Sequence, residues 1–333
     1  MQKKLLAIAL AAIGVIGAVG SAQASALAQS TLSITDFQFL NAAGTLKLDK
    51  SQFDILNIQD STNLNPFLNG VFNPYSNATV GGAPLLKTVK CVSGTPAVAG
   101  PCGTMNSATP FAPIIAPPPP GGDGALAASE LTGAPITGLP TPPNPGGGAD
   151  AKTAALAQLT HSGVANSTAN LSLLTKVSFT PVAGNMAVTI DFKALMHLIT
   201  FLDSDLTANA GVGWTIDIVD HTVGGNVFHW APDGVVGTGI SGIAGTTELF
   251  DDCNLQQSVG VFGPGVATAD CAAGSHYEAR TGILLNTHQY DLTLAHHNNA
   301  DVLVVPEPSS VMLAGLALAG LGFSTRRKQV KGD

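Results

Sequence analysis

The stretch GWTIDIVDHTVGGNVFHW, residues 213–230, decides the fold class. Trp214, Ile216 and Ile218 alternate with polar residues, so the hydrophobic period is two and these three side chains share one face of a strand. A Gly-Gly pair then provides a turn, and residues 226–230 resume the alternation. The stretch therefore predicts a β-hairpin with one buried face.

Short strands of the same kind flank this hairpin on both sides. Alternating segments occur within residues 31–49, 169–180, 186–192 and 282–296. Turn residues separate them at intervals of roughly 8–12 residues, which is typical of all-β domains. We therefore expect an all-β fold, and specifically an antiparallel β-sandwich.

A Pro- and Gly-rich segment, residues 93–148, interrupts this pattern and includes a run of four prolines. Such a composition buries too little apolar area to offset the entropy lost on ordering, so it predicts a long loop or linker inserted into the domain. The β-domain would then have a first part, residues 29–92, and a main part, residues 149–304. Within the main part, residues 149–158 favour one short helix, and residues 193–202 suit a strand or a helix.

The N-terminus has the anatomy of a secretory signal peptide. A basic start precedes an apolar run of about 15 residues and the small-x-small site Ala22-Gln23-Ala24. Cleavage after Ala24 makes residues 1–24 the signal peptide, with cleavage after Ala28 as an alternative. A retained membrane anchor is the other interpretation, although the apolar run is short for a span.

The C-terminus, residues 305–330, combines three features in order. Pro306-Glu307-Pro308 comes first, an apolar run over residues 311–323 follows, and the basic cluster Arg326-Arg327-Lys328 comes last. The apolar run is shorter than the ~20 residues of an average transmembrane helix, but local thinning and snorkelling basic residues allow a short helix to span. By the positive-inside rule, the basic end stays in the cytoplasm and the preceding chain faces outward.

These three features together resemble the PEP-CTERM sorting signal, which consists of Pro-Glu-Pro, a short helix and a basic cluster. The resemblance implies a Gram-negative host that produces exopolysaccharide, and processing by the secretion machinery and an exosortase. It also implies a location at the cell surface or in the extracellular matrix of a biofilm, with the C-terminal transmembrane helix as a transient anchor. A plain C-terminal membrane anchor is the alternative.

The charge distribution argues against nucleic acid as a partner. The chain has a net charge of −8, but six of its 14 Lys and Arg and only two of its 22 Asp and Glu lie in the two terminal segments, so the exported part carries about −12. A strongly acidic protein repels phosphate backbones. Charged residues make up only 11% of the chain, and small residues are abundant, which is typical of a secreted β-protein.

All four cysteines lie in the exported part, where disulfides persist. Of the three possible pairings, the local one is the simplest, with Cys91 bonded to Cys102 and Cys253 bonded to Cys271. Each bond would stabilise the fold by about 3 kcal/mol through the entropy of the unfolded chain. A zinc site formed by all four thiolates is the alternative, but the usual Cys-x-x-Cys spacing is missing.

The sequence contains no recognisable catalytic motif, so we expect a non-enzymatic protein without a cofactor or metal. Nucleophile elbows, zinc-protease pairs and phosphate-binding loops do not occur. His288 and His296 would share one face of a strand as two metal ligands do, but surface histidines are the ordinary interpretation. The loops at Asp203 and Asp251 offer oxygen ligands, which leaves a structural calcium ion as an alternative.

The leading hypothesis is an exported, non-enzymatic surface or matrix protein. The alternative is a carbohydrate-binding module or adhesin that binds exopolysaccharide. Such modules stack sugars on exposed aromatic rings, and the candidates are Trp214, Trp230, Tyr277 and Tyr290, although the two tryptophans lie in predicted strands and suit the core. A row of exposed aromatic rings on one sheet face would distinguish the alternative.

Overall fold

The computed structural model describes residues 25–80, 85–115, 122–136, 148–182, 184–203 and 206–304, apart from the side chains of residues 56 and 172–177. The described residues belong to one compact unit, Ser25–Val304. They form antiparallel strands and one 3-10 turn, η1 (Lys50–Gln52), which confirms the predicted all-β sandwich. Among them, no helix has the length and apolar character needed to cross a bilayer. The predicted signal peptide, residues 1–24, and the C-terminal segment, residues 305–330, lie outside the described residues.

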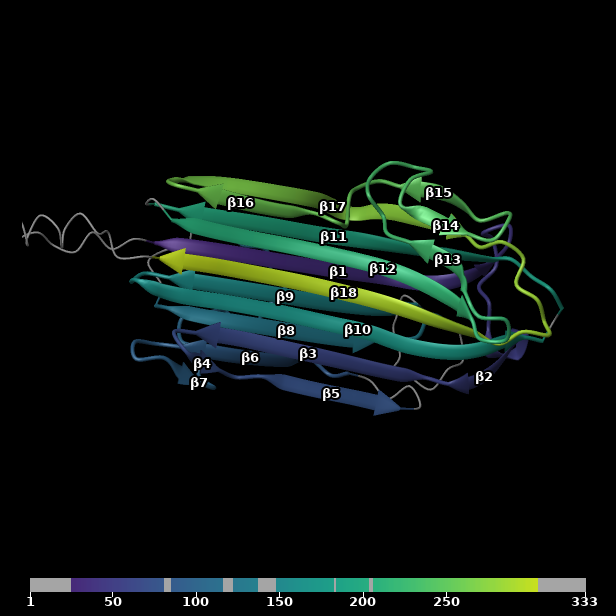
Figure 1. Ribbon diagram of the computed structural model, residues 1–333, viewed down its shortest axis with the longest axis horizontal. Helices are drawn as coiled ribbons and strands as arrows, with labels where there is room; N and C mark the ends of the chain where they lie inside the picture. The colour runs from purple at the N-terminus through teal and green to yellow at the C-terminus, as the bar shows by residue number, and fades with distance from the viewer. Residues whose placement is uncertain are drawn as a thin grey trace, which may run out of the picture. The chain divides into compact units, whose positions relative to one another are not determined.

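One sheet, which we call sheet A, has eight strands in the order β15-β17-β11-β1-β9-β8-β6-β7 (Figure 1). All its pairings are antiparallel. Its central strands are β1 (Ala26–Asn41), β9 (Ala149–Leu159), β11 (Val188–Leu202), β17 (Gly265–Arg280) and β8 (Gly124–Thr132). Shorter strands form the edges: β15 (Thr247–Asp251), β6 (Thr88–Ser93) and β7 (Val98–Ala99).

The other sheet, sheet B, has ten strands, and its main path is β14-β13-β12-β18-β10-β3-β4. Additional strands pair alongside this path: β16 with β12, β2 with β10, and β5 with β3. Its long strands are β3 (Gln59–Leu68), β10 (Gly163–Pro181), β12 (Thr207–Asp220) and β18 (Tyr290–Val304). The short ones are β2 (Phe53–Asn57), β4 (Val71–Phe72), β5 (Tyr75–Val80), β13 (Asn226–Trp230), β14 (Ile240–Gly242) and β16 (Ser258–Phe262).

The hairpin that decided the fold class forms as predicted. Strands β12 and β13 pair antiparallel, with Ile216 opposite Trp230 and Ile218 opposite Phe228. Gly224 and Gly225 both have positive φ, as a tight turn between two strands requires. The alternating side chains of β12 point between the two sheets and are buried.

The interior between the sheets is aromatic in one half. The ring of Phe192 in β11 lies 5.7 Å from Phe37, 5.8 Å from Trp214 and 5.5 Å from Trp230, measured between ring centroids. It also stacks on Tyr277 at 4.9 Å. These rings come from both sheets, so they join the two layers through a large apolar area.

The other half of the interior contains small and polar side chains. Asn298 donates to Ser30 Oγ at 2.7 Å, and Thr153 Oγ1 donates to Asn298 Oδ1 at 2.7 Å. Ser30 in turn donates to the carbonyl of Gly211 at 2.7 Å. Ser30 and Thr153 belong to sheet A, whereas Asn298 and Gly211 belong to sheet B. Hydrogen bonds therefore satisfy these buried polar groups across the two layers.

The first and last described strands occupy central positions and begin and end at the same end of the unit. In sheet A, Ala26 of β1 pairs with Leu202 of β11; in sheet B, Thr207 of β12 pairs with Leu303 of β18. Strand β1 also packs across β12 and β18. Figure 1 shows β18 ending at the end of the unit where β1 begins.

Two predictions of irregular or helical structure are wrong for described residues. Residues 124–132, expected within a loop or linker, form strand β8, and residues 149–158, expected as a helix, belong to β9. Both strands are rich in buried alanines and sit between neighbouring strands of sheet A. Ala127 packs against sheet B, whereas Ala128 and Ala154 are covered on the outer face of sheet A. Tertiary packing thus overrides the helical preference of alanine. Residues 193–202, which suited either structure, are part of strand β11.

The segment that follows Cys91 also differs from a free linker. Met105, Phe111 and Ile114 pack on Leu126 and Ile199 on the outer face of sheet A. Gln29 fixes the same segment, because its amide donates to Ala112 O at 3.1 Å and accepts from Ile114 N at 2.7 Å. Residues 105–114 of the Pro- and Gly-rich segment therefore form a packed strap over sheet A, whereas residues 124–132 belong to the sheet itself.

Candidate functional site

The C-terminal exit of the domain is the end of a central strand. Val304 is buried and pairs with Gly163 of β10, and Leu303 pairs with Val164 on one side and Thr207 on the other. The β-ladder on both sides of β18 continues to the last residues of the strand. The chain therefore leaves the sheet directly from a rigid, doubly paired strand.

The structure pairs Cys91 with Cys102 and Cys253 with Cys271, which confirms the local pairing. No cysteine is free, so a zinc site built from four thiolates is excluded. The first disulfide lies in the apolar cluster under the strap, together with Met105 and Leu126. It fixes the start of the strap on sheet A.

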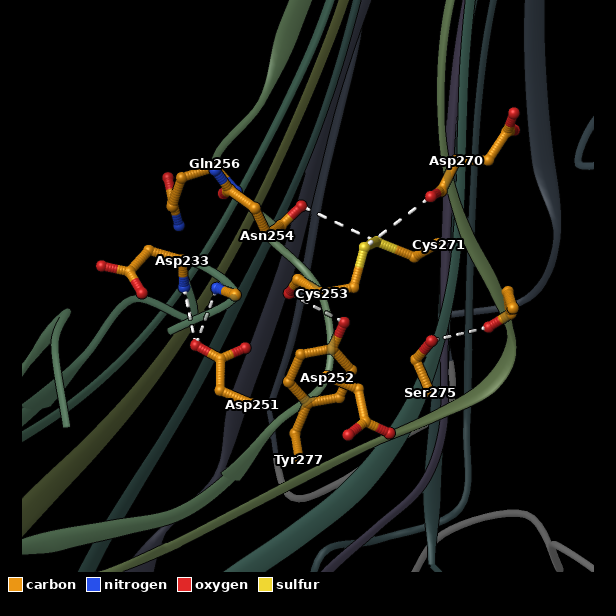
Figure 2. The surroundings of a disulfide bond; sticks show 12 residues. Asp233, Asp251, Asp252, Cys253, Asn254, Gln256, Asp270, Cys271, Ser275 and Tyr277 are labelled. Atoms are coloured by element: carbon orange, nitrogen blue, oxygen red, sulfur yellow. Dashed lines mark hydrogen bonds between the residues drawn. A yellow bond between two sulfur atoms is a disulfide. The ribbon is translucent and has the colours of Figure 1, made fainter. Parts of the chain in front are cut away.

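The second disulfide attaches a loop to β17, as Figure 2 shows. The hydroxyl of Tyr277 donates to Cys253 O at 3.0 Å, and Asp252 Oδ2 accepts from the backbone N–H of His276 at 2.7 Å. Burial raises the pKa of the Tyr277 hydroxyl above its ordinary value, and nearby Asp251 and Asp252 add to this effect. The tyrosine therefore remains a proton donor to this loop at all ordinary pH values.

In the acidic loops considered as calcium ligands, one oxygen each of Asp251 and Asp203 accepts backbone hydrogen bonds, whereas Asp251 Oδ1 is buried without a partner among the described residues. Asp251 Oδ2 accepts from the backbone N–H groups of Asp233 and Gly234, both at 2.9 Å (Figure 2). Asp203 Oδ1 accepts from Ser25 N at 2.6 Å. In the described parts of these loops, three carboxylate or imidazole ligands do not come together.

The four aromatic residues proposed for sugar stacking are all buried. Trp214, Trp230 and Tyr277 are 0% exposed and Tyr290 is 2% exposed. The indole N–H of Trp230 donates to Glu248, and the hydroxyl of Tyr290 accepts from Leu285 N at 2.8 Å. The tryptophans lie in the core as their strands suggested, and the expectation that the two tyrosines offer a stacking surface is wrong.

Comparison with known families identifies the segment that follows β18. Residues 304–328 match the family model of the PEP-CTERM protein-sorting motif. The chain carries a PEP-CTERM sorting motif. This motif marks an exported protein that an exosortase sorts to the cell surface. The match begins at Val304, the last residue of β18, so the motif follows the folded domain without a spacer.

Other comparisons add nothing about the domain itself. A search of curated proteins found no match. Among solved structures, the structure of infectious bursal disease virus Gt strain aligns with 11% identity over 89% of this chain and 85% of that chain, at a TM-score of 0.08. A TM-score this low carries no argument about the fold.

The histidines do not form the metal pair considered from the sequence. His288 Nδ1 lies 2.6 Å from Asp220 Oδ2, whereas His296 points between the sheets and His297 points outward to Asn170. The hydrogen bond from His288 and burial change the pKa of Asp220 in opposite directions, and the net effect lowers it. Six histidines have a ring nitrogen close to an aspartate carboxylate: His161, His197, His221, His229, His276 and His288.

His296 is a buried, neutral member of the inter-sheet polar contacts. Its Nδ1 lies 3.1 Å from Thr153 Oγ1, and its ring meets the Trp214 ring edge-on at 4.5 Å. Its Nε2 has no hydrogen-bond partner among the described residues. Burial lowers the pKa of His296 to about 3, because a charge there would lose its hydration without gaining a partner.

This burial predicts a pH dependence of folding. The unfolded chain binds a proton at His296 below its ordinary pKa of 6.5, and the folded chain does not until about pH 3. Stability from this residue is therefore complete above pH 6.5 and decreases as the pH falls toward 3. The free energy of unfolding, measured in urea, should therefore change less with pH in His296→Gln than in the wild-type protein. The two slopes should differ by up to about 1.4 kcal/mol per pH unit.

His297→Gln is the matched control, because this neighbour points outward from the same strand. It should leave the pH dependence between pH 4 and 6 close to that of the wild-type protein. Identical slopes in the wild-type protein and His296→Gln would contradict a buried, neutral imidazole.

Proposed function

We propose that the protein is a non-enzymatic component of the surface or extracellular matrix of a Gram-negative bacterium, delivered there by an exosortase. Residues 1–24 serve as the signal peptide, and the apolar run at residues 311–323 serves as a transient membrane helix. The observation that carries the proposal is the PEP-CTERM motif at residues 304–328, attached to the end of a folded disulfide-bonded domain.

The position of the chain ends supports this delivery. Ser25 and Val304 lie at the same end of the described unit. Ala26 pairs with Leu202 at the end of β11, and Leu303 pairs with Thr207 at the start of β12, which follows β11 in the chain. Only six residues separate Val304 from the apolar run, so that run begins at most ~25 Å from the end of β18. A chain held by this run would keep one end of the sandwich near the membrane.

The use of polar groups supports a non-enzymatic role. Buried Glu248 accepts from the indole of Trp230 and from the backbone N–H of Gly237, and Asp251 accepts from two backbone N–H groups. Burial raises the pKa of Glu248, and these donors oppose the effect. These acidic groups organise loops and strand ends through hydrogen bonds. The two disulfides suit a location outside the cytoplasm.

The sorting function predicts a processed C-terminus in the native host. The intact mass of wild-type protein from the surface or matrix fraction should correspond to a chain that ends near Pro306. Glu307→Ala should remain full-length and stay with the membrane, because the exosortase no longer accepts the motif. Ser310→Ala, just outside the tripeptide, is the control and should be processed normally. A full-length wild-type chain ending at Asp333 in the membrane would contradict sorting.

A second candidate function, binding of neutral exopolysaccharide, is favoured by the outer face of sheet B. Three successive cross-strand rows on β3, β10, β18 and β12 each contain two asparagines, together with Thr168, His297, Asp301 and Phe67. We call the asparagines of these rows, with Thr168, the amide face, and its members are Asn63, Asn65, Asn166, Thr168, Asn170, Asn209 and Asn299. Each amide offers both a donor and an acceptor, as the hydroxyls of a sugar do.

Two further features of the amide face suit an uncharged polymer. Gly211 lies under the side chain of Asn299, and Gly260 lies under that of Asn209. A Cβ added to either glycine would lie 2.5 Å from the Oδ1 atom of its asparagine. These glycines let the amides lie flat on the sheet. The carboxylate among the rows, Asp301, is held by Asn166 and Asn299, and burial raises its pKa.

Affinity electrophoresis of the exported protein in gels containing the host's purified exopolysaccharide tests this candidate. The wild-type protein should be retarded, and the double variant Asn65→Ala with Asn209→Ala should bind about tenfold more weakly, because two hydrogen-bonding amides are lost. Asn77→Ala on β5 is the control. The ladder partner of Asn77 is Thr62, which points inward, so Asn77 is not part of the amide face. Equal retardation of the wild-type protein and the double variant would exclude the amide face as the binding surface.

A further inference from the structure

Asp191, His276 and Glu278 form a cluster on the outer face of sheet A, next to the loop that the second disulfide holds. Asp191 of β11 is the direct ladder partner of Glu278 of β17, and His276 precedes Glu278 by two residues. Residues two apart in a strand point to the same face, so all three side chains converge. One ligand atom from each lies within 4.8 Å of the other two.

The set of atoms fits a transition-metal ion. An imidazole nitrogen and two carboxylate oxygens are ligands that Zn²⁺ accepts at roughly 2.0–2.2 Å, which places them roughly 3.3 Å from one another. His276 Nε2 lies 2.6 Å from Asp191 Oδ1, which is a hydrogen-bond distance. An ion would replace this hydrogen bond, so these two atoms would move apart by roughly 0.7 Å while the Glu278 carboxylate moves in to complete the set. The three residues are only half-buried, which leaves room for water at a fourth position.

Neighbouring groups hold the three side chains in place. Gln38 on the adjacent strand β1 donates to Asp191 Oδ2 at 2.6 Å, and the ring of Phe250 lies against the imidazole of His276 at 4.8 Å. The backbone N–H of His276 is fixed by Asp252 at 2.7 Å. Outer contacts of this kind orient metal ligands and fix the ring that binds.

The turn that contains Gly44 lies against Glu278. Gly44 has φ +69°, a conformation that favours glycine, and a Cβ added there would lie 2.9 Å from Glu278 Oε1 and displace the end of that side chain. The arrangement also places two carboxylates directly opposite each other, which is unfavourable in a ladder. Burial, with a further contribution from Asp191, raises the pKa of Glu278. A bound cation would relieve this repulsion.

We propose that Asp191, His276 and Glu278 bind one divalent transition-metal ion of the zinc class, with water completing its coordination. The nitrogen ligand separates this site from a calcium site, because calcium takes oxygen ligands. The other five histidine–aspartate pairs lack a third such ligand within reach in the described part of the chain. Sequence analysis missed the site because His276 and Glu278 alternate in one strand, but their partner Asp191 lies 85 residues from His276 and is brought there only by β11–β17 pairing.

Titration of the metal-free exported protein with ZnCl₂, followed by calorimetry and by the thermal unfolding midpoint, tests the proposal. The wild-type protein should have one tight Zn²⁺ site, and any further Zn²⁺ should bind more weakly. Its thermal unfolding midpoint should rise in the presence of Zn²⁺. His276→Gln and Glu278→Gln should each weaken this binding at least tenfold and remove the thermal shift. CaCl₂ should produce neither effect.

His229→Gln is the matched control, because His229 is paired only with Asp217, at 2.7 Å. This variant should keep the tight site and the thermal shift. The unfolding midpoint of each ligand variant without metal is compared with that of the wild-type protein, which reveals any folding defect. Because two ligands are changed separately, such a defect in one variant leaves the other as a valid test. Tight binding that survives in both ligand variants, or a wild-type protein without a saturable one-to-one site, would overturn the proposal.

Discussion

The structure depends on the packing of β1 against β18, because each of these strands lies at the centre of its own sheet. Strand β1 is paired on both sides by β9 and β11, and β18 by β10 and β12. Between them, Asn298 donates to Ser30, and Thr153 donates to Asn298. These hydrogen bonds replace water for polar groups that would otherwise be buried at a cost of about 1–3 kcal/mol each. The domain therefore needs both ends of its chain in place.

This arrangement connects the fold to delivery. The last residues of β18 complete the central ladder of sheet B, and the sorting motif begins at the final residue of that strand. Removal of the chain beyond Val304 leaves every described strand intact. The two outer faces differ in chemistry. Sheet B presents asparagines with Asp301 among them, and the part of sheet A beside the second disulfide presents an imidazole next to two carboxylates.

Local patterns predicted local structure well, and long-range pairing could not be predicted. The alternation of residues 213–230 specified the β12–β13 hairpin, and short separations specified both disulfides. Strands β8 and β9 were missed because alanine has no strand preference, and what holds them as strands is pairing within sheet A together with burial of both their faces. The sorting motif is continuous in sequence and was recognised there. The cluster of Asp191, His276 and Glu278 depends on strand pairing and was not.

The most direct test of this account compares the urea unfolding of two exported chains, one ending at Val304 and one ending at Asn299. The account predicts that the first unfolds cooperatively at the same midpoint as the chain that retains the motif. The second lacks Ala300, Val302 and Val304, which are buried, and should unfold at a clearly lower midpoint or without cooperativity. Equal midpoints for the two truncated chains would contradict the central role of β18.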